Sequence, residues 1–324
     1  MIDFISREAF RLAPYTPGEQ PQNQEYMKLN TNESPFPPSE KVIRAVMEEQ
    51  VQRLNLYSDP SCKNLHRVLA EWYKVQPENI ISGNGSDEIL AFAFRAFCGE
   101  GKPVAYADIT YGFYKAQTAL FGLEAHIIPL WEDFTMDMDE YLDFPGMLVI
   151  ANPNAPTGIS LPREEIERLL RANPQRVILV DEAYVDFGGE SCVPLIEAMN
   201  RVKYSFNPYN VNRMTMAAGI AAVEDEIYFK KCCYTIVENR RWTTAELEKL
   251  GFSVLPSKTN FVFAKSDKIS GGELYQKLKE RGILVRWFPE ERIFDYLRIT
   301  IGTKEQMETL IFEISRILQK EGGI

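Results

Sequence analysis

Four short apolar stretches constrain the fold of this chain more than any other feature. Each is about four residues long, and segments whose apolar residues recur at helical spacing separate them. The stretches are Asn79–Ser82, Val104–Ala107, Met147–Ile150 and Val177–Val180. Continuous apolar runs are typical of strands buried on both faces, and strands that alternate with helices form parallel sheets. The sequence therefore predicts an α/β fold with a mostly parallel sheet wrapped by helices.

The pattern changes after about residue 245, where a smaller α+β domain is expected. Its strands are predicted at 261–263, 283–285 and 297–301, between a helix over 273–280 and another that opens with the capping box of Thr303 and Gln306.

Three parts of the chain are expected from these patterns. Residues 1–38, rich in Pro, Asn and Gln, are predicted to form an N-terminal arm that lies on another part of the molecule. Residues 39–245 form the large domain, whose first helix, over 40–50, has Ser39 as its N-cap. Residues 246–324 form the small domain, reached through a long helix near 228–250.

Composition excludes several classes of function. The chain has 36 basic and 46 acidic residues, a formal charge of −10, so we expect no nucleic-acid partner and no anionic membrane partner. No apolar run approaches the roughly 20 residues of a membrane span, and the N-terminal residues do not have the layout of a signal peptide. Five scattered cysteines and two histidines favour neither disulfides nor a metal site, so a cytoplasmic location is expected.

Ligands of open α/β sheets bind beyond the carboxyl ends of the strands, so the segments after the apolar stretches are the candidates for chemistry. Gly83–Glu88 opens a helix, and glycines at a helix N-terminus suit a phosphate, although a tight turn with an N-cap is an alternative. The GxGxxG pattern fails at Glu88. In Asp108–Tyr114 an aromatic ring is available to stack on a flat heterocycle, or simply to fill the core.

Two further segments come after the third and fourth stretches. Asn152–Gly158 is a rigid Pro- and Gly-containing loop that either presents an amide to a ligand oxygen or serves only as a turn. Asp181 ends a buried strand, where a carboxylate needs a partner. A protonated ring nitrogen would be such a partner, with the Tyr184 hydroxyl nearby, while a helix N-cap is the structural alternative.

In this order and at these strand ends, the segments resemble the pyridoxal-phosphate aminotransferases of the aspartate-aminotransferase fold, and most closely those that act on histidinol phosphate. The likeness extends from Leu29–Pro35, similar to the family's L-N-x-N-E-N-P, to Tyr296–Thr303. It implies an aspartate-aminotransferase-type three-layer sandwich with a mostly parallel sheet, a smaller α+β C-terminal domain, and pyridoxal 5'-phosphate as the cofactor.

The resemblance assigns roles to individual residues around the cofactor. Gly85, Ser86 and Asp87 would hold its phosphate, and Tyr111 would stack on its ring. The carboxylate of Asp181 would keep the ring nitrogen protonated, which makes the ring an electron sink. These roles are completed by the hydroxyl of Tyr184, which would bind the ring's phenolic oxygen.

The same likeness assigns roles at the edges of the site. Tyr57 would reach the cofactor phosphate of a partner subunit, which implies a homodimer with shared sites. The fork of Arg298 would bind an anionic substrate group, assisted by Asn32. Many relatives have an asparagine where this chain has Ala155, and Asn154 would then make that amide contact.

One departure from the family is large. The family's Schiff-base lysine lies roughly thirty residues beyond the aspartate, with a phosphate-binding arginine after it. Here Asp186–Ile196 matches the family segment before that region and Glu197–Asn207 matches the segment after it, so a stretch with two strands is absent. Lys203 lies near the expected position, but its neighbours match the later segment. Since losing two buried strands would cost far more than a typical stability of about 5–15 kcal/mol, we expect the natural protein to have a segment that this sequence lacks.

The resemblance implies an aminotransferase that takes histidinol phosphate and 2-oxoglutarate to imidazole-acetol phosphate and glutamate. Its partners would be such small amino-acid or amino-phosphate substrates. A related lyase, such as a threonine-phosphate decarboxylase, is an alternative. A non-catalytic protein that keeps the cofactor pocket is another, if the lysine segment is truly absent.

Overall fold

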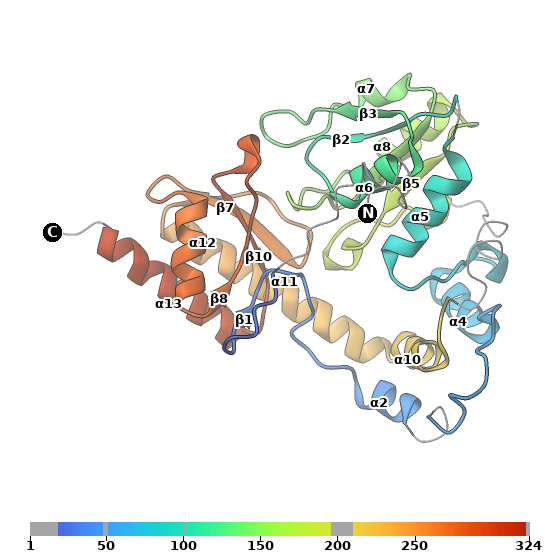
Figure 1. The fold of residues 1–324 in the computed structure, drawn as a ribbon, viewed down its shortest axis with the longest axis horizontal. Coiled ribbons are helices and arrows are strands. Elements are labelled where there is room, and N and C mark those ends of the chain that lie inside the picture. The colour runs from blue at the N-terminus through green and yellow to red at the C-terminus, as the bar shows by residue number, and fades with distance from the viewer. Residues whose placement is uncertain (1–18, 48–50, 100, 196–209, 322–324) are drawn as a thin grey trace, which may run out of the picture.

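The computed structural model describes residues 19–47, 51–99, 101–195 and 210–321. The larger part of the molecule contains a sheet of four parallel strands in the order β3-β2-β4-β5 (Figure 1). The strands are β2 (Val104–Ala107), β3 (Ala125–Ile128), β4 (Met147–Ala151) and β5 (Ile178–Asp181). Three of the predicted stretches are thereby confirmed as parallel strands.

Helices cover both faces of this sheet, which gives three layers. On one face, Leu148 and Ile150 of β4 pack with Ile166 and Leu169 of α8. On the other face, alternate strand residues pack with α5 and α6 through side chains such as Tyr114. The helices of this part are α4 (Lys63–Tyr73), α5 (Ser86–Phe97), α6 (Phe113–Phe121), α7 (Asp139–Leu142) and α8 (Arg163–Ala172).

The prediction of a strand over 79–82, the first of the four apolar stretches, is wrong. Pro77–Asn79 forms a 3-10 turn, and Ile80–Ser82 has no strand assignment. A strand requires a neighbour for its backbone groups, and the described part of the chain places none beside this segment. The carbonyl of Ser82 accepts a 3.0 Å hydrogen bond from the Asn210 side chain instead.

Strand β5 lies at the edge of the sheet, although its sequence is typical of a central strand. Its residues are only half-buried, whereas β4 is buried along its whole length. Edge strands usually carry charges, prolines or bulges, and β5 has no charge before Asp181. The carbonyl of Val177 accepts from Leu148 of β4 at 3.0 Å, and that of Asp181 accepts from Asn152, just after β4, at 2.9 Å. The backbone groups of the alternate residues of β5 therefore face the open side. The described part of the sheet thus ends at a strand whose sequence suits a further neighbour.

The small domain is built on an antiparallel sheet in the order β6-β7-β10-β9. A two-stranded parallel pair, β1 with β8, joins the N-terminal arm to it. The predicted strand at 283–285 corresponds to β8, which ends at Leu284, and β9 begins after it at Arg286. The elements are β1 (Met27–Lys28), β6 (Phe252–Val254), β7 (Phe261–Ser266), α12 (Gly271–Glu280), β8 (Ile283–Leu284), β9 (Arg286–Trp287), β10 (Tyr296–Thr300) and α13 (Lys304–Glu321).

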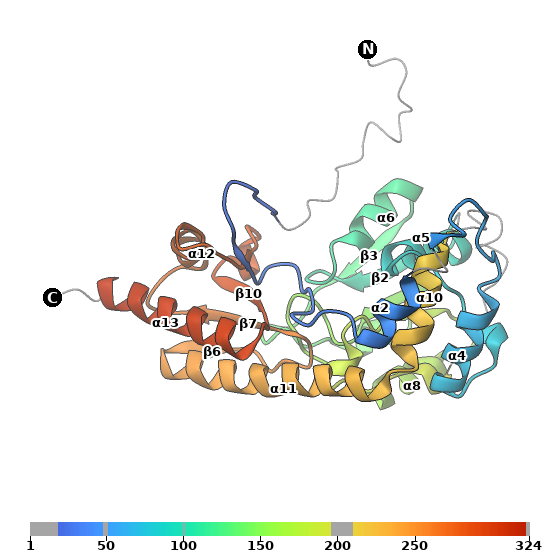
Figure 2. The ribbon, with the colours of Figure 1, turned by 90° about the horizontal axis from the view of Figure 1, so that it is seen from below.

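A long helix, α11 (Glu226–Lys249), connects the two parts and confirms the helix predicted near 228–250. Figure 2 shows α11 running beneath the molecule from α10 (Arg213–Val223) to the neighbourhood of α13. Since α11 crosses residue 245, the proposed domain boundary lies inside this helix. Helix α2 (Glu40–Val46) packs on α10.

Both helix caps predicted from the sequence are present. Ser39 accepts from the backbone N–H of Val42 at the start of α2. Thr303 and Gln306 exchange side-chain and backbone hydrogen bonds of 2.8 and 3.3 Å at the start of α13. The remaining short 3-10 helices are Val185–Phe187, Val193–Leu195 and Glu291–Ile293. Among the residues described, none of the helices is long and apolar enough to cross a membrane.

Candidate active site

A cavity of about 1020 Å³ lies where the carboxyl ends of β2, β4 and β5 face the small domain. It brings together many of the residues predicted from the sequence. Those among its lining residues are Asn32, Ser86, Tyr111, Asp181, Tyr184 and Arg298. The other predicted residues, Gly85, Asp87, Asn154 and Tyr57, lie outside the lining.

The N-terminus of α5 supplies one wall. Gly85 precedes the helix with φ = +88°, a conformation that favours glycine, and Ser86 is the first helical residue. The first N–H groups of a helix have no partner within it and favour an anion. Asp87 accepts a 2.9 Å hydrogen bond from the Tyr111 hydroxyl, so the helix terminus and the aromatic ring are held together.

Asp181, at the end of β5, has hydrogen bonds to both carboxylate oxygens. The Tyr114 hydroxyl donates to Oδ2 at 2.8 Å, and the Ala183 N–H donates to Oδ1 at 3.2 Å. Tyr114 is fully buried, and this burial together with the negative charge of Asp181 raises the pKa of its phenol well above the usual value. The phenol therefore stays protonated and remains a donor.

Tyr114 was not among the site residues predicted from the sequence. Tyr114 is the second residue of α6 and comes three residues after Tyr111, but nothing in the sequence marks its hydroxyl as a partner of Asp181. Its ring meets the ring of Tyr111 edge-on, with centroids 5.8 Å apart.

Tyr184 is reached by the N-terminal arm. Asn32 Nδ2 donates to the Tyr184 hydroxyl at 2.8 Å, while Thr300 Oγ1 donates to Asn32 Oδ1 at 2.9 Å. The main-chain N–H of Asn32 in turn donates to Thr300 Oγ1 at 3.0 Å, and its main-chain carbonyl accepts from Asn260 at 3.0 Å. The arm, β10 and the end of β5 are thus joined at the cavity.

The small-domain side of the cavity carries three arginines, Arg286, Arg292 and Arg298, together with Glu290 and Glu291. Arg298 Nη2 donates to the carbonyl of Asn30 at 3.0 Å, and its guanidinium lies 5.4 Å from the Phe261 ring centroid. Arg292 instead forms an ion pair with Asp108, at the end of β2.

The loop after β4 is held by its own asparagine. Asn154 Oδ1 accepts from Thr110 at 2.8 Å, and Nδ2 donates to the carbonyl of Ile109 at 3.0 Å and to Thr157 at 3.1 Å. The side chain is buried, and Ala155 and the two prolines of the loop line the cavity. A contact between Asn154 and a ligand stays a prediction.

Tyr57 does not line this cavity. Tyr57 is 82% exposed, and its carbonyl accepts from Arg213 at 2.9 Å. Its contact with a partner's site stays a prediction. Lys203 lies outside the described residues. Lys115 of α6 is the lysine among the described residues that line the cavity, and its side chain is exposed.

The sequence profile of the family described as Aminotransferase class I and II matches residues 24–206 and 192–314. The chain belongs to this aminotransferase family. A histidinol-phosphate aminotransferase of Marinomonas sp. (strain MWYL1) is 46% identical, covering 96% of this chain and 98% of that protein. A histidinol-phosphate aminotransferase of Clostridium botulinum (strain Okra / Type B1) is 40% identical over 99% of this chain and 100% of that protein.

Solved structures agree with this aminotransferase fold. A putative histidinol-phosphate aminotransferase from Erwinia carotovora atroseptica has a TM-score of 0.83 at 22% identity, covering 91% of this chain and 96% of that one. A histidinol-phosphate aminotransferase from Sinorhizobium meliloti, in complex with pyridoxal-5'-phosphate, has a TM-score of 0.80 at 23% identity and covers 92% of each chain. The predicted aspartate-aminotransferase-type architecture is confirmed.

The comparisons also show where this aminotransferase differs from its relatives. The alignment with the Marinomonas protein spans 347 residues, more than the 324 of this chain, so the relative has residues with no counterpart here. The two family matches overlap over 192–206, which places the interruption after β5. This agrees with the segment that is expected, from the sequence, to be absent, and with the central-strand character of β5.

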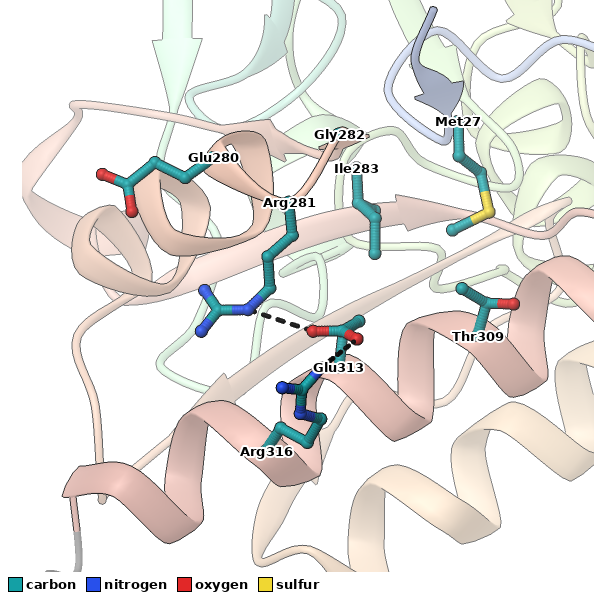
Figure 3. Close-up of a pocket in the computed structure, with 8 residues that line it drawn as sticks. All are labelled: Met27, Glu280, Arg281, Gly282, Ile283, Thr309, Glu313 and Arg316. Carbon is teal, nitrogen blue, oxygen red and sulfur yellow. Dashed lines mark hydrogen bonds and ion pairs between the residues drawn. The ribbon is translucent and has the colours of Figure 1, made fainter.

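A second hollow, of about 610 Å³, lies on the small domain of this aminotransferase (Figure 3). Glu313 accepts from Arg281 Nε at 3.0 Å and from Arg316 Nη1 at 3.1 Å. The two arginines of this hollow therefore neutralise a carboxylate inside it. We assign no chemistry to this hollow.

Proposed function

We propose that this aminotransferase binds pyridoxal phosphate in the cavity between the sheet and the small domain. Three features of the chain support this: an anion site at the N-terminus of α5, a carboxylate fixed at the end of β5, and an aromatic ring between them. The single observation that carries the proposal is that Ser86, Tyr111 and Asp181 line one cavity of about 1020 Å³.

In this proposal each group has one task. The N–H groups at Gly85 and Ser86 bind the phosphate, and Asp87 holds the Tyr111 ring against the cofactor face. Asp181 accepts from the protonated ring nitrogen, and Tyr184 donates to the phenolic oxygen. When bound, the cofactor stabilises negative charge at the carbon that loses its proton during amino-group transfer.

We propose histidinol phosphate as the amino donor and 2-oxoglutarate as the acceptor, with imidazole-acetol phosphate and glutamate as products. Both the donor and the acceptor are anionic, and the small-domain wall presents Arg286 and Arg298 to them. The relatives that cover nearly the whole chain are histidinol-phosphate aminotransferases, which supports this choice. A threonine-phosphate decarboxylase activity would be recognised by release of carbon dioxide in place of amino-group transfer.

Amino-group transfer by this family requires a lysine that binds the cofactor covalently, and this requirement limits what the chain can do by itself. Among the residues that the structure describes, the lysine that lines the cavity is Lys115, which is exposed on α6. We propose that the 324-residue chain binds the cofactor without a covalent bond, and that transfer requires the segment present in the relatives. This favours the non-catalytic binding protein as the second candidate function for the chain in isolation.

Borohydride treatment and intact mass distinguish these two candidates. A chain of 37.2 kDa that binds pyridoxal phosphate and loses it on dialysis after borohydride is the cofactor-binding form. A larger mass, with cofactor fixed covalently by borohydride and transfer from histidinol phosphate to 2-oxoglutarate, is the complete enzyme. Absence of cofactor binding in both forms would overturn the proposed function.

We also propose a homodimer in which Tyr57 reaches the partner's cofactor phosphate. Tyr57 projects into solvent from a segment that exposes Val51, Leu54 and Leu56, and such exposed apolar residues are typical of an interface. Light scattering of the purified chain tests this, and a Tyr57→Ala variant that dimerises but binds the cofactor more weakly is the expected result. A monomer would contradict the proposed dimer.

A further inference from the structure

We infer that Tyr114 is a positioning residue that fixes Asp181 for the ring nitrogen of the cofactor. The inference rests on the proposed cofactor binding and adds a residue to it. Tyr114 does not line the cavity, so it would act through the carboxylate and not by touching the cofactor.

The geometry leaves Tyr114 with one polar task. Its side chain is fully buried, and its hydroxyl donates at 2.8 Å to Asp181 Oδ2. With Oδ1 receiving the Ala183 N–H at 3.2 Å, the carboxylate is held at both oxygens. Each carboxylate oxygen accepts more than one hydrogen bond, so acceptor capacity remains for a ligand donor.

The ring of Tyr114 has its own fixed surroundings. It stacks on Phe94 with centroids 6.4 Å apart and meets the rings of Tyr106 and Tyr111 edge-on at 5.9 and 5.8 Å. These contacts on three sides restrict the ring, so the hydroxyl is delivered at a defined point. The same residue therefore supports both the carboxylate and the proposed stacking ring of Tyr111.

Asp181 needs an additional contact to fix its position, because β5 is the edge strand of the described sheet. Its open side gives the strand no backbone partner there. A single charge-assisted hydrogen bond contributes more than a neutral one, and here it joins the last residue of β5 to α6. Loss of that bond would leave the carboxylate free to turn away from the ring nitrogen.

The test compares two ligands and two variants. Pyridoxal phosphate and its 1-deaza analogue, in which CH replaces the ring nitrogen, have the same shape, but only the first places a ring N–H donor at Asp181. Tyr114→Phe removes one hydroxyl. The matched control is Tyr106→Phe, because Tyr106 is also buried in the same cluster but its hydroxyl pairs with Thr118 at 3.2 Å.

We expect Tyr114→Phe to weaken binding of pyridoxal phosphate about tenfold, equivalent to about 1.4 kcal/mol, and to leave the affinity for the deaza analogue unchanged. The circular dichroism band of the bound cofactor, which reports how rigidly the ring is held, should shrink in the same variant. Tyr106→Phe should change neither property.

Equal losses for both ligands, or no loss for either, would overturn the role of Tyr114 and leave cofactor binding intact. Failure of the unaltered chain to bind pyridoxal phosphate would instead overturn the proposed function, and this inference with it. If Tyr114→Phe does not fold, 3-fluorotyrosine at position 114 keeps the shape and changes the donor strength of the hydroxyl. A change in affinity for pyridoxal phosphate, with none for the deaza analogue, is then expected, and its absence contradicts the inference.

Discussion

Asn32 and Tyr184 are 152 residues apart in the sequence and share a 2.8 Å hydrogen bond at the cavity, in which the asparagine is the donor. The direction of this bond is set by its neighbours. Thr300 Oγ1 accepts the main-chain N–H of Asn32, so its own proton goes to Asn32 Oδ1 and Nδ2 faces Tyr184. The proton of Tyr184 is thereby left for an acceptor in the cavity.

Asn32→Asp should therefore weaken cofactor binding. Asparagine and aspartate both tolerate the left-handed backbone at this position, where φ is +57°, so the fold should be retained. The carboxylate would take the Tyr184 proton, which removes about 1 kcal/mol of hydrogen bonding to the cofactor, or about a fivefold loss of affinity. Titration with pyridoxal phosphate measures this, with Asn64→Asp at an exposed position of α4 as the control. Unchanged affinity in Asn32→Asp would contradict the assigned direction of the bond.

Arg292 is expected to hold the small domain on the large one. Its guanidinium pairs with Asp108 and donates to the carbonyls of Leu130 and Trp131 at 2.9 and 3.0 Å. Arg292→Gln should lower the free energy of unfolding by about 1–2 kcal/mol, because several acceptors lose one donor group. Urea unfolding measures the change. Arg168→Gln, which removes exposed ion pairs with Glu165 and Asp139, should cost less than about 1 kcal/mol, and an equal cost for both variants would contradict the expectation.

Three cysteines should resist alkylation in the folded chain. Burial raises the pKa of Cys98 and Cys233 to about 11, and burial with the nearby Glu182 raises that of Cys192 to about 12. At pH 8 these thiols are protonated, and the thiolate is the reactive form. Peptide mapping after iodoacetamide should show slow labelling at pH 8 and fast labelling in urea.

The same shifts give a pH dependence of stability. Folding favours the neutral thiols, so their contribution is fully present below the unfolded pKa near 9 and is lost as the pH rises towards the folded values of about 11 to 12. Urea unfolding at pH 8 and pH 10 should show the loss, and Cys192→Ala should make it smaller. If the folded chain is labelled at all three thiols as fast as the unfolded chain, the cysteines are not buried. A free energy of unfolding that rises from pH 8 to pH 10 would contradict their burial too.

Insertion of the relative's segment should complete the sheet. A chimaera would receive the stretch of the Marinomonas protein that has no counterpart here, placed within 192–206. We expect higher stability, because β5 gains a neighbour for its open backbone groups, and covalent fixation of the cofactor by borohydride. A glycine–serine insert of the same length is the control and should produce neither effect. A chimaera no more stable than the control would show that β5 does not need the segment.

The fold was largely predictable because its strands are continuous apolar runs, which reveal burial on both faces. The prediction of a strand at 79–82 was wrong for a reason that lies outside these residues. A strand depends on a neighbour, and local sequence does not state whether that neighbour is present. Ile80 and Ile81 are apolar enough for a strand, yet the described part of the chain offers them no pairing partner.

The site was predictable where a residue comes directly after a strand or opens a helix, as with Asp181 and Ser86. Residues that act through a second side chain were harder to find. Tyr114 looks like any core aromatic in the sequence, and only the folded structure shows that its hydroxyl meets a carboxylate 67 residues away. The pairing of Asp108 with Arg292 likewise depends on how the two domains meet.

A crystal structure of the chain with pyridoxal phosphate tests the central claim most directly. We predict the cofactor phosphate at the N-terminus of α5, beside Ser86, and the ring nitrogen within hydrogen-bond distance of an Asp181 oxygen, with Tyr114 still bound to Oδ2. A cofactor ring bound elsewhere, or with its nitrogen turned away from Asp181, would contradict the claim.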